Sequence, residues 1–370
     1  MTGISFEQVK QDCIHFRGGI PCKPNKAHGA VCLACDHYKP VSKRILIIKL
    51  GALGDVIRTT PLVVRFREEY GDCHITWLTL SPEVLPTDSI NTILKPDAFS
   101  LFHIRESAYD IAINLDKETE ACQLLSAVNA KEKYGFAYDN NTIVPATPEA
   151  THKLMTGFFD ELSQANTKSY LEEIFEICHM DFRMEPYLIN KNESLAATWK
   201  ERFRELAGEK MIIGLNTGCG PRWNTRLWPE ENWRELANLL REAGFFPVFL
   251  GGSLEHEKNT RMAQVTGAHY PGHFSLEEFI ALSDACTVIL TQVSMMMHIA
   301  TALQKRMVLM NNIFNKHEFE LYGRGEIAGP SSGCECYYGN SCKRGTSCMH
   351  EITPEQIFNA IGRVAEKPVQ

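Results

Sequence analysis

A run of apolar residues that leads into a glycine-rich turn is the feature that most restricts how this chain can fold. Residues 45–64 are ILIIKLGALGDVIRTTPLVV. The first four predict a buried strand, and residues 56–70 predict the helix that follows. The glycines of the turn, Gly51 and Gly54, let the backbone approach a ligand without a Cβ in the way. A strand, a turn and a helix in this order are typical of open α/β sheets, which bind ligands at the carboxyl ends of their strands.

Asp55 ends this turn, and its carboxylate has two interpretations. A side-chain oxygen at the start of a helix can cap an unpaired backbone amide. A carboxylate at the carboxyl end of a parallel strand can instead take part in binding or catalysis. The turn alone does not choose between them. It is not a GxGxxG sequence, and the chain has no GxxxxGK[ST], so neither a dinucleotide fingerprint nor a P-loop is predicted.

Strands alternate with helices along the rest of the chain, in two similar halves. The expected strands are residues 74–79, 110–115, 133–136, 211–216, 246–250, 287–290 and 307–310, and the expected helices are residues 118–128, 152–178, 229–244, 254–266, 276–283, 296–303 and 352–364, with 89–94 as part of a short helix. Such alternation predicts an α/β protein with two doubly wound domains facing a cleft. The expected parts are a Cys-rich appendage (1–40), two domains (41–185 and 186–330), and a Cys-rich loop with a C-terminal helix (331–370).

The composition is that of a globular protein, with 44% hydrophobic and 22% charged residues in a chain of 370. A net charge of −7 argues against a nucleic-acid partner. The first residues contain no apolar segment of the kind found in signal peptides. The longest apolar tract, residues 286–303, holds too many polar groups for a membrane span. We therefore expect a cytoplasmic protein, for which peripheral contact with an inner membrane stays open.

The chain has thirteen cysteines, and eight of them form two clusters near its ends. The clusters are Cys13, Cys22, Cys32 and Cys35, and separately Cys334, Cys336, Cys342 and Cys348. In a reducing compartment, clustered cysteines indicate metal before disulfides. Neither segment has enough apolar residues to fold alone, so structural zinc or iron is predicted on each, with His15, His28 and His37 as substitute ligands in the first. Free or redox-active thiols, a mobile loop and disulfides are the alternatives.

Several residues in the second half follow expected strands and could bind a phosphorylated ligand. Backbone amides at the helix that follows Ser294 could hold a phosphate. Arg222 and Arg226 could neutralise a diphosphate, and Glu255 could accept ribose hydroxyls. Ordinary surface charges would explain these three residues equally well. His298 by itself is more typical of a hydrogen-bonded core histidine.

Four segments resemble glycosyltransferase family 9, the ADP-heptose heptosyltransferases, in the family's own order. They are Lys49-Leu-Gly-Ala-Leu-Gly-Asp-Val56 with Thr59-Thr60-Pro61-Leu62, Gly220-Pro-Arg-Trp-Asn-Thr-Arg-Leu-Trp-Pro229, Gly251-Gly252 with Glu255, and His298-Ile-Ala-Thr-Ala-Leu303. The resemblance runs from about residue 43 to the C-terminus. It implies a GT-B fold of two Rossmann-like domains, with the acceptor in the first, the nucleotide sugar in the second, and inverting chemistry between them.

The same resemblance assigns roles to residues. It implies that Asp55 is the general base and that Arg226 takes the place of a phosphate-binding lysine. The implied acceptor-side residues are Lys49, Gly51 and Gly54, and the implied donor-binding residues are Arg222, Arg226, Glu255, Ser294, Met295, Met297 and His298.

One departure from the family concerns the donor loop. The family pattern is Thr-x-Asp-[Ser/Thr]-Gly-Pro-Met-His, whereas this chain has Thr291-Gln-Val-Ser-Met-Met-Met-His298. The acidic residue is replaced by Val293 and the glycine by Met295, which leaves the donor's identity open. This loop and the Cys-rich tail look similar to a divergent branch that includes autotransporter heptosyltransferases, which carry a cysteine-bound metal.

We therefore expect an inverting transferase that moves a heptose or related sugar from a nucleotide-diphosphate donor, with ADP-heptose favoured, to a glycan, lipid-linked or protein acceptor. An acceptor hydroxyl is a poor nucleophile at neutral pH, so a carboxylate must take its proton. The leaving diphosphate needs positive charge. Because the chain has no Asp-x-Asp, we expect no catalytic magnesium. A nucleotide-sugar epimerase and a non-catalytic metal-bearing binding protein are the alternatives.

Overall fold

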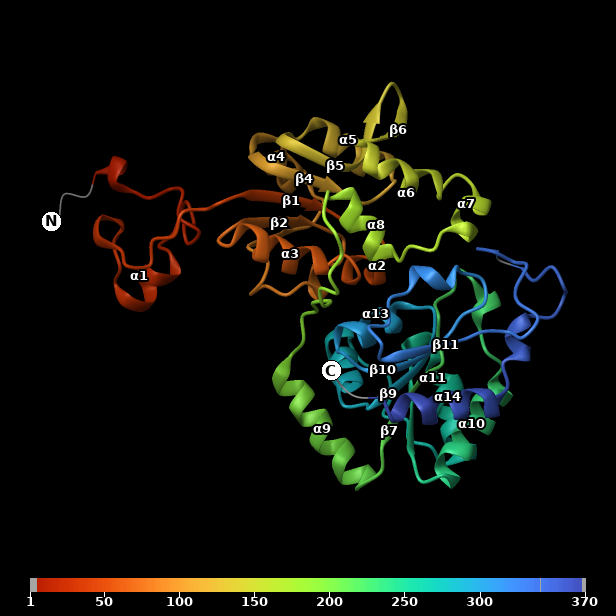
Figure 1. The fold of residues 1–370 in the computed structure, drawn as a ribbon. Coiled ribbons are helices and arrows are strands. Elements are labelled where there is room, and N and C mark those ends of the chain that lie inside the picture. The colour runs from red at the N-terminus through yellow and green to blue at the C-terminus, as the bar shows by residue number, and fades with distance from the viewer. Residues whose placement is uncertain (1–4, 340, 368–370) are drawn as a thin grey trace.

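Two sheets of mostly parallel strands form the body of the molecule in the computed structural model, which describes residues 5–339 and 341–367 (Figure 1). The first sheet has the order β3-β2-β1-β4-β5-β6, and only the β5–β6 pair is antiparallel. Its strands are β1 Arg44–Ile48, β2 His74–Leu78, β3 Thr92–Leu94, β4 Ala108–Asn114, β5 Asn129–Asp139 and β6 Thr142–Pro145. The second sheet has the order β11-β10-β9-β7-β8 and is parallel throughout. Its strands are β7 Ile212–Asn216, β8 Phe246–Leu250, β9 Val288–Gln292, β10 Arg306–Met310 and β11 Gly325–Ala328.

Each sheet is buried on both faces, as strand β1 illustrates. Ile45 and Ile47 face one hydrophobic core, while Leu46 and Ile48 face another, and all four side chains are fully buried. Side chains that alternate in this way stay apolar on both sides only when helices cover both faces. The predicted buried strand is therefore confirmed.

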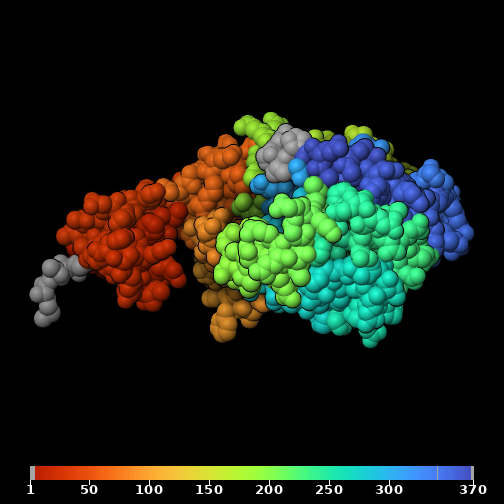
Figure 2. All heavy atoms as spheres, turned by 90° about the horizontal axis from the view of Figure 1, so that it is seen from below, coloured from red at the N-terminus to blue at the C-terminus, as the bar shows by residue number. Residues whose placement is uncertain are grey.

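Helices cover these sheets and link their strands. In the first half they are α2 Leu53–Ile57, α3 Pro61–Tyr70, α4 Ala98–Glu106, α5 Thr119–Ala127, α6 Thr151–Met155, α7 Asp160–Ala165 and α8 Tyr170–Ile177. In the second half they are α9 Glu193–Ala207, α10 Glu230–Glu242, α11 His256–Thr266, α12 Leu276–Asp284, α13 Met295–Ala302 and α14 Pro354–Ala365. One more helix, α1 Lys23–His28, lies in the N-terminal segment, which forms a knob at one end of the molecule (Figure 2).

Three sequence predictions about these elements were wrong. The helix expected over residues 56–70 is divided into α2 and α3, because Pro61 lacks the amide that would continue the first helix. The helix expected over residues 152–178 is divided into α6, α7 and α8. Residues 92–94, expected in a short helix, form the edge strand β3 beside β2. In addition, α4, α9, β6 and β11 were not predicted.

The two halves meet through α2 and α13, which pack against each other (Figure 1). This contact brings the turn after β1 against the helix after β9. The carboxyl ends of both sheets therefore face the same region. No helix in the described part of the chain is both long and apolar enough to cross a membrane.

Candidate active site

Asp55 lies in the first turn of α2, but it does not cap that helix. The N-cap residue is Ala52, whose side chain makes no hydrogen bond to the first amides of the helix. The capping interpretation is therefore wrong. The Asp55 carboxylate instead forms an ion pair with Arg58, with 2.8 Å between Oδ1 and Nη2, and about 35% of its side chain remains exposed.

The charges around Asp55 favour its ionised form. Burial alone would raise the pKa of this carboxyl, but the positive charges of Arg58 and Lys49, with smaller effects of His298 and Lys153, lower it below its ordinary value. The Arg58 guanidinium lies 3.6 Å from the centre of the Tyr170 ring, which holds it in place. Asp55 is therefore a carboxylate at neutral pH.

Lys49 and Gly51, both predicted on the acceptor side, belong to a buried ion-pair network. The Lys49 ammonium pairs with Asp116, whose carboxylate also accepts the backbone amides of Leu50 and Gly51. A Cβ at Gly51 would stand 3.1 Å from Asp116 Oδ1, so glycine allows the turn and this carboxylate to approach each other closely. Lys49 therefore fixes the turn that carries Asp55. Sequence reasoning missed Asp116, although its place two residues after β4 puts it at a strand's carboxyl end.

Gly54 allows a histidine of the second half to approach Asp55. A Cβ at Gly54 would stand only 2.6 Å from His298 Cδ2, so no larger residue fits without a shift. His298 is buried, and its Nδ1 atom has no hydrogen-bond partner among the described residues. Burial, with a smaller effect of Arg58, lowers the pKa of His298 to about 3 although Asp55 opposes this shift. His298 is therefore neutral and lies against the turn that carries Asp55.

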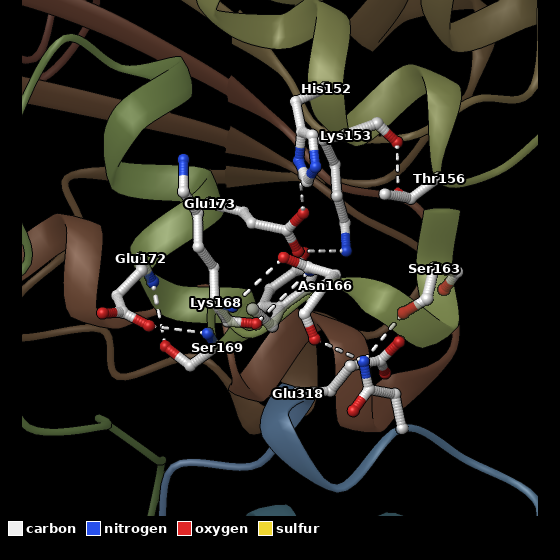
Figure 3. Close-up of polar contacts among 12 residues, drawn as sticks. His152, Lys153, Thr156, Ser163, Asn166, Lys168, Ser169, Glu172, Glu173 and Glu318 are labelled. Atoms are coloured by element: carbon white, nitrogen blue, oxygen red, sulfur yellow. Dashed lines mark hydrogen bonds and ion pairs between the residues drawn. The ribbon is translucent and has the colours of Figure 1, made fainter. Parts of the chain in front are cut away.

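A second set of charges lines the same region and was not predicted. Lys153 pairs with Glu173 at 2.6 Å, and Figure 3 shows Glu173 directed toward His152 and Lys153. Lys117 donates to the Lys153 carbonyl, and burial together with Lys153 lowers the pKa of Lys117 to about 8. Lys117 lies three residues after the end of β4, so its position at the carboxyl end of a strand could have been predicted from the sequence. Nothing in the sequence marks Lys153, because α6 comes to the site only through the fold.

A cavity of about 500 Å³ opens at the carboxyl ends of β7, β8 and β9. Its lining combines glycines and polar groups with an apolar wall that includes Phe274, Leu276 and Phe279. Of the predicted donor residues, Glu255, Ser294 and Met295 line it, whereas Arg222, Arg226, Met297 and His298 do not. No sequence pattern indicated the apolar wall, because these residues precede or open α12 and reach the cavity only through packing.

Two of these predicted residues have geometries of their own. Arg226 is buried, and its guanidinium donates to the carbonyl oxygens of Cys219 and Val293, so it ties together the two loops that border the cavity. Arg222 is exposed and lies 4.3 Å from the Trp223 ring centre.

Glu255 projects into the cavity from the turn that precedes α11. Its Oε2 atom accepts a hydrogen bond from the Gly252 amide at 3.0 Å, and no group in the described part of the chain donates to the other oxygen. One helical turn later, Lys258 donates to the Thr217 carbonyl at 3.0 Å, and burial lowers the pKa of Lys258 although the charge of Glu255 opposes this shift. Lys258 was missed, although its spacing of three residues from Glu255 places both on one helix face.

All thirteen cysteines are free thiols. No group of three or more His, Cys, Asp or Glu residues in the described ranges has a metal-binding arrangement, so the predicted metal sites are not confirmed. In the second cluster, Cys336 Sγ accepts the Lys343 amide at 3.1 Å and Cys334 Sγ accepts the Cys336 amide at 3.4 Å. Cys342 Sγ lies apart and donates to the Thr346 carbonyl.

Two α/β halves in contact, one with Asp55 after its first strand and the other with a cavity at the carboxyl ends of its strands, form a GT-B fold, as predicted. The family description "Glycosyltransferase family 9 (heptosyltransferase)" matches residues 100–324, and the chain belongs to this family. The predictions of fold class, family and transferase activity are thereby confirmed.

Three known proteins illustrate the similarity. Lipooligosaccharide heptosyltransferase 2 of Haemophilus influenzae is 24% identical over 295 residues, which cover 72% of this chain and 82% of that protein. A family 9 glycosyltransferase of Veillonella parvula has a similar structure, with a TM-score of 0.66, 19% identity, and coverage of 88% of this chain and 97% of that one. The dodecameric iron-containing heptosyltransferase TibC of enterotoxigenic E. coli, in complex with ADP-D-β-D-heptose, matches with a TM-score of 0.56, 14% identity, and coverage of 94% and 80%.

Proposed function

We propose that this protein is an inverting heptosyltransferase that moves a heptose from ADP-heptose to a cell-surface glycan or protein acceptor. The observation that carries the proposal is the position of Asp55, an ionised carboxylate beside the helix α13, whose first residue, Met295, lines the cavity of the second half. Two relatives support the substrate classes, since TibC binds ADP-D-β-D-heptose and the Haemophilus protein acts on lipooligosaccharide.

In this proposal the acceptor hydroxyl attacks the anomeric carbon of the heptose while Asp55 takes the hydroxyl proton. Arg58 keeps the carboxylate oriented and ionised for that step. The diphosphate leaves toward the backbone amides that open α13, next to Ser294. Glu255 accepts hydrogen bonds from the ribose hydroxyls, and the adenine ring lies against the apolar wall that includes Phe274.

The test is release of nucleotide from purified protein supplied with ADP-heptose and, in parallel, with other nucleotide sugars. We expect ADP release from ADP-heptose that rises when bacterial glycan or protein acceptor fractions are added. Conversion of the sugar without any acceptor would favour an epimerase instead. Binding of ADP-heptose with no turnover under any condition would favour a non-catalytic protein.

We propose domain boundaries near residues 41, 186 and 331. We also propose that the reaction takes place in the cytoplasm. The supporting argument for the cytoplasm is chemical, because cysteines that form no disulfide are typical of a reducing compartment. An acceptor carried by a lipid would bring the protein into peripheral contact with the inner membrane.

We also propose that structural zinc or iron binds the two cysteine clusters, at Cys334, Cys336, Cys342 and Cys348 and separately at Cys13, Cys22, Cys32 and Cys35. Hydrophobic burial contributes little to the loop that carries the second cluster, since the buried residues among those described from 331 to 348 are two of its cysteines, Cys336 and Cys348. Backbone amides already point at the sulfurs of Cys334 and Cys336, as they do around metal-bound thiolates. TibC, which is iron-containing, supports the choice of metal.

Metal at the second cluster would hold the segment that leads into α14, and it would take no part in the transfer step. We expect the Cys342→Ser, Cys348→Ser double variant to lose one equivalent of zinc or iron and to expose α14 to proteolysis. Elemental analysis of protein purified without chelator measures the loss. The matched control replaces Cys32 and Cys35 and keeps this ion. Metal that survives the first double variant would contradict the assignment.

A further inference from the structure

The four cysteines of the N-terminal segment surround one small cavity. Cys13, Cys22, Cys32 and Cys35 all line a space of about 40 Å³, although they come from separate turns of the chain. Cys22 directly precedes α1, and Cys32 opens a single 3-10 turn that ends beside Cys35. The spacing of these cysteines along the sequence did not require them to meet, yet the fold brings four thiols from three turns together.

This segment has almost no hydrophobic core. Among the described residues from 5 to 40, Pro24 is the one buried residue, and no residue before Ile45 belongs to the hydrophobic cores of the molecule. Its large apolar side chains, such as Phe6 and Leu33, are exposed. A segment of this size without apolar burial needs another source of stability.

The path of the backbone nevertheless forms a closed unit. The ends of the segment pair with each other, since Ile14 donates to the Lys39 carbonyl and Val41 donates to the Asp12 carbonyl, both at 2.8 Å. A few hydrogen bonds exposed to water contribute little net free energy to such an arrangement. The turns between the paired ends meet at the cysteine-lined cavity.

The structure also narrows the ligand set. His28 and His37 stack on each other with ring centroids 5.2 Å apart, and neither lines the cavity. His15 and Lys10 do line it, and the Lys10 ammonium can offset part of the negative charge that four thiolates bring to a divalent ion. Four sulfur donors favour zinc or iron over magnesium or calcium.

We infer that Cys13, Cys22, Cys32 and Cys35 bind one zinc or iron ion, and that this ion, not hydrophobic packing, folds residues 5–40 into a separate module. The inference deepens the proposed cofactor and is independent of the transfer reaction. Each cysteine releases its thiol proton to solvent as the sulfur binds, so the ion replaces four protons and changes oxidation state in no step.

The test uses the full-length chain with Cys32→Ser and Cys35→Ser together, compared with a His28→Ala, His37→Ala control. We expect the cysteine variant to lose one metal equivalent by elemental analysis and to be cut by trypsin within residues 10–26, while its affinity for ADP stays unchanged. The histidine control should keep both the metal and the protection. Chelator treatment of the parent protein should reproduce the cleavage, and added zinc or iron should reverse it.

Three results would overturn the inference: a parent protein in which this segment holds no zinc or iron, a cysteine variant that retains its full metal content, or a histidine control that loses metal. Visible absorption of the parent distinguishes the metals, because iron–thiolate bonds absorb there and zinc–thiolate bonds do not. Detection of acid-labile sulfide would show that the cysteines hold an iron–sulfur cluster and not a single ion, which would also overturn the proposal. A parent protein that binds the metal but shows no transferase activity would contradict the proposed reaction and leave the metal site unaffected.

Discussion

Asp55 lies among positive charges, and this limits what a substitution there can do. Asparagine has nearly the same shape, keeps a polar contact for Arg58 and removes the carboxylate that we propose as the base. We expect Asp55→Asn to fold and bind nucleotide like the parent while turnover falls by roughly two to four orders of magnitude. Steady-state kinetics and calorimetry with ADP measure the two effects. Asp139→Asn, at an exposed carboxylate, is the control. A variant with full activity, or one whose sole defect is a lower melting temperature, would refute the role of Asp55 as base.

His298 makes the stability of the protein depend on pH. Its pKa is about 3 in the folded chain and about 6.5 in an unfolded one, so below pH 6.5 the unfolded state binds a proton that the folded state does not. Stability therefore falls as the pH drops from 6.5 toward 3, by about 2 kcal/mol at pH 5 for this one group.

We expect His298→Gln to remove that part of the pH dependence. Urea unfolding of the parent and the variant at pH 7 and pH 5 measures it. His74, whose pKa burial lowers to about 4, contributes equally to both proteins and cancels in the comparison. Equal losses of unfolding free energy in the two proteins between these pH values would show that His298 is protonated in the folded state.

At the scale of single elements, Arg226 connects the loops that border the cavity of the second half. Its guanidinium binds two carbonyls at once, one from the loop after β7 and one from the loop after β9. We expect Arg226→Ala to weaken ADP binding by roughly 1.5–3 kcal/mol, since it leaves buried carbonyls unpaired and lets both loops move. Arg226→Lys should recover little, because an ammonium lacks the planar fork.

Calorimetry with ADP measures these changes, and Arg222→Ala, which removes a neighbouring exposed arginine, is the control. Unchanged affinity in Arg226→Ala would mean that the loops keep their positions without it.

The elements also show how far sequence patterns reach. Strand β1 was predictable because a short run of four apolar residues that ends at a glycine-rich turn is typical of a buried strand. Strand β3 was not, since three residues at a sheet edge carry no period and pair only when β2 is already in place. Glu255 and Ser294 were found in the cavity because they follow strands. Phe274 and Lys153 were not found, because their positions depend on tertiary packing that no local pattern encodes.

At the scale of the whole molecule, Asn315 holds the two halves together on the side of α7. Its Nδ2 atom donates to the carbonyls of Ser163 and Asn166, each at 2.7 Å, and Ser163 also bonds to the Tyr337 hydroxyl. Figure 3 shows Ser163 and Asn166 at this junction. We expect Asn315→Ala to loosen it by about 1–3 kcal/mol, because both carbonyls lose a buried partner.

Hydrogen exchange of the α7 amides measures this change, together with the KM for acceptor. The control is Asn312→Ala, whose side chain bonds to Thr225 and Cys348 within the second half. Exchange in α7 that is no faster in Asn315→Ala than in the control would mean that other contacts hold the halves together.

Helix α13 reaches both the cavity of the second half and the turn that carries Asp55. Its first residue, Met295, lines the cavity of the second half, and His298, one turn later, lies against Gly54 and next to Asp55. A shift of this helix on occupation of the cavity therefore changes the surroundings of Asp55. Binding free energies obey reciprocity, so the factor by which a bound donor changes the affinity for acceptor equals the factor by which a bound acceptor changes the affinity for donor. The protein cannot tighten its hold on one substrate through α13 without altering its hold on the other by the same ratio.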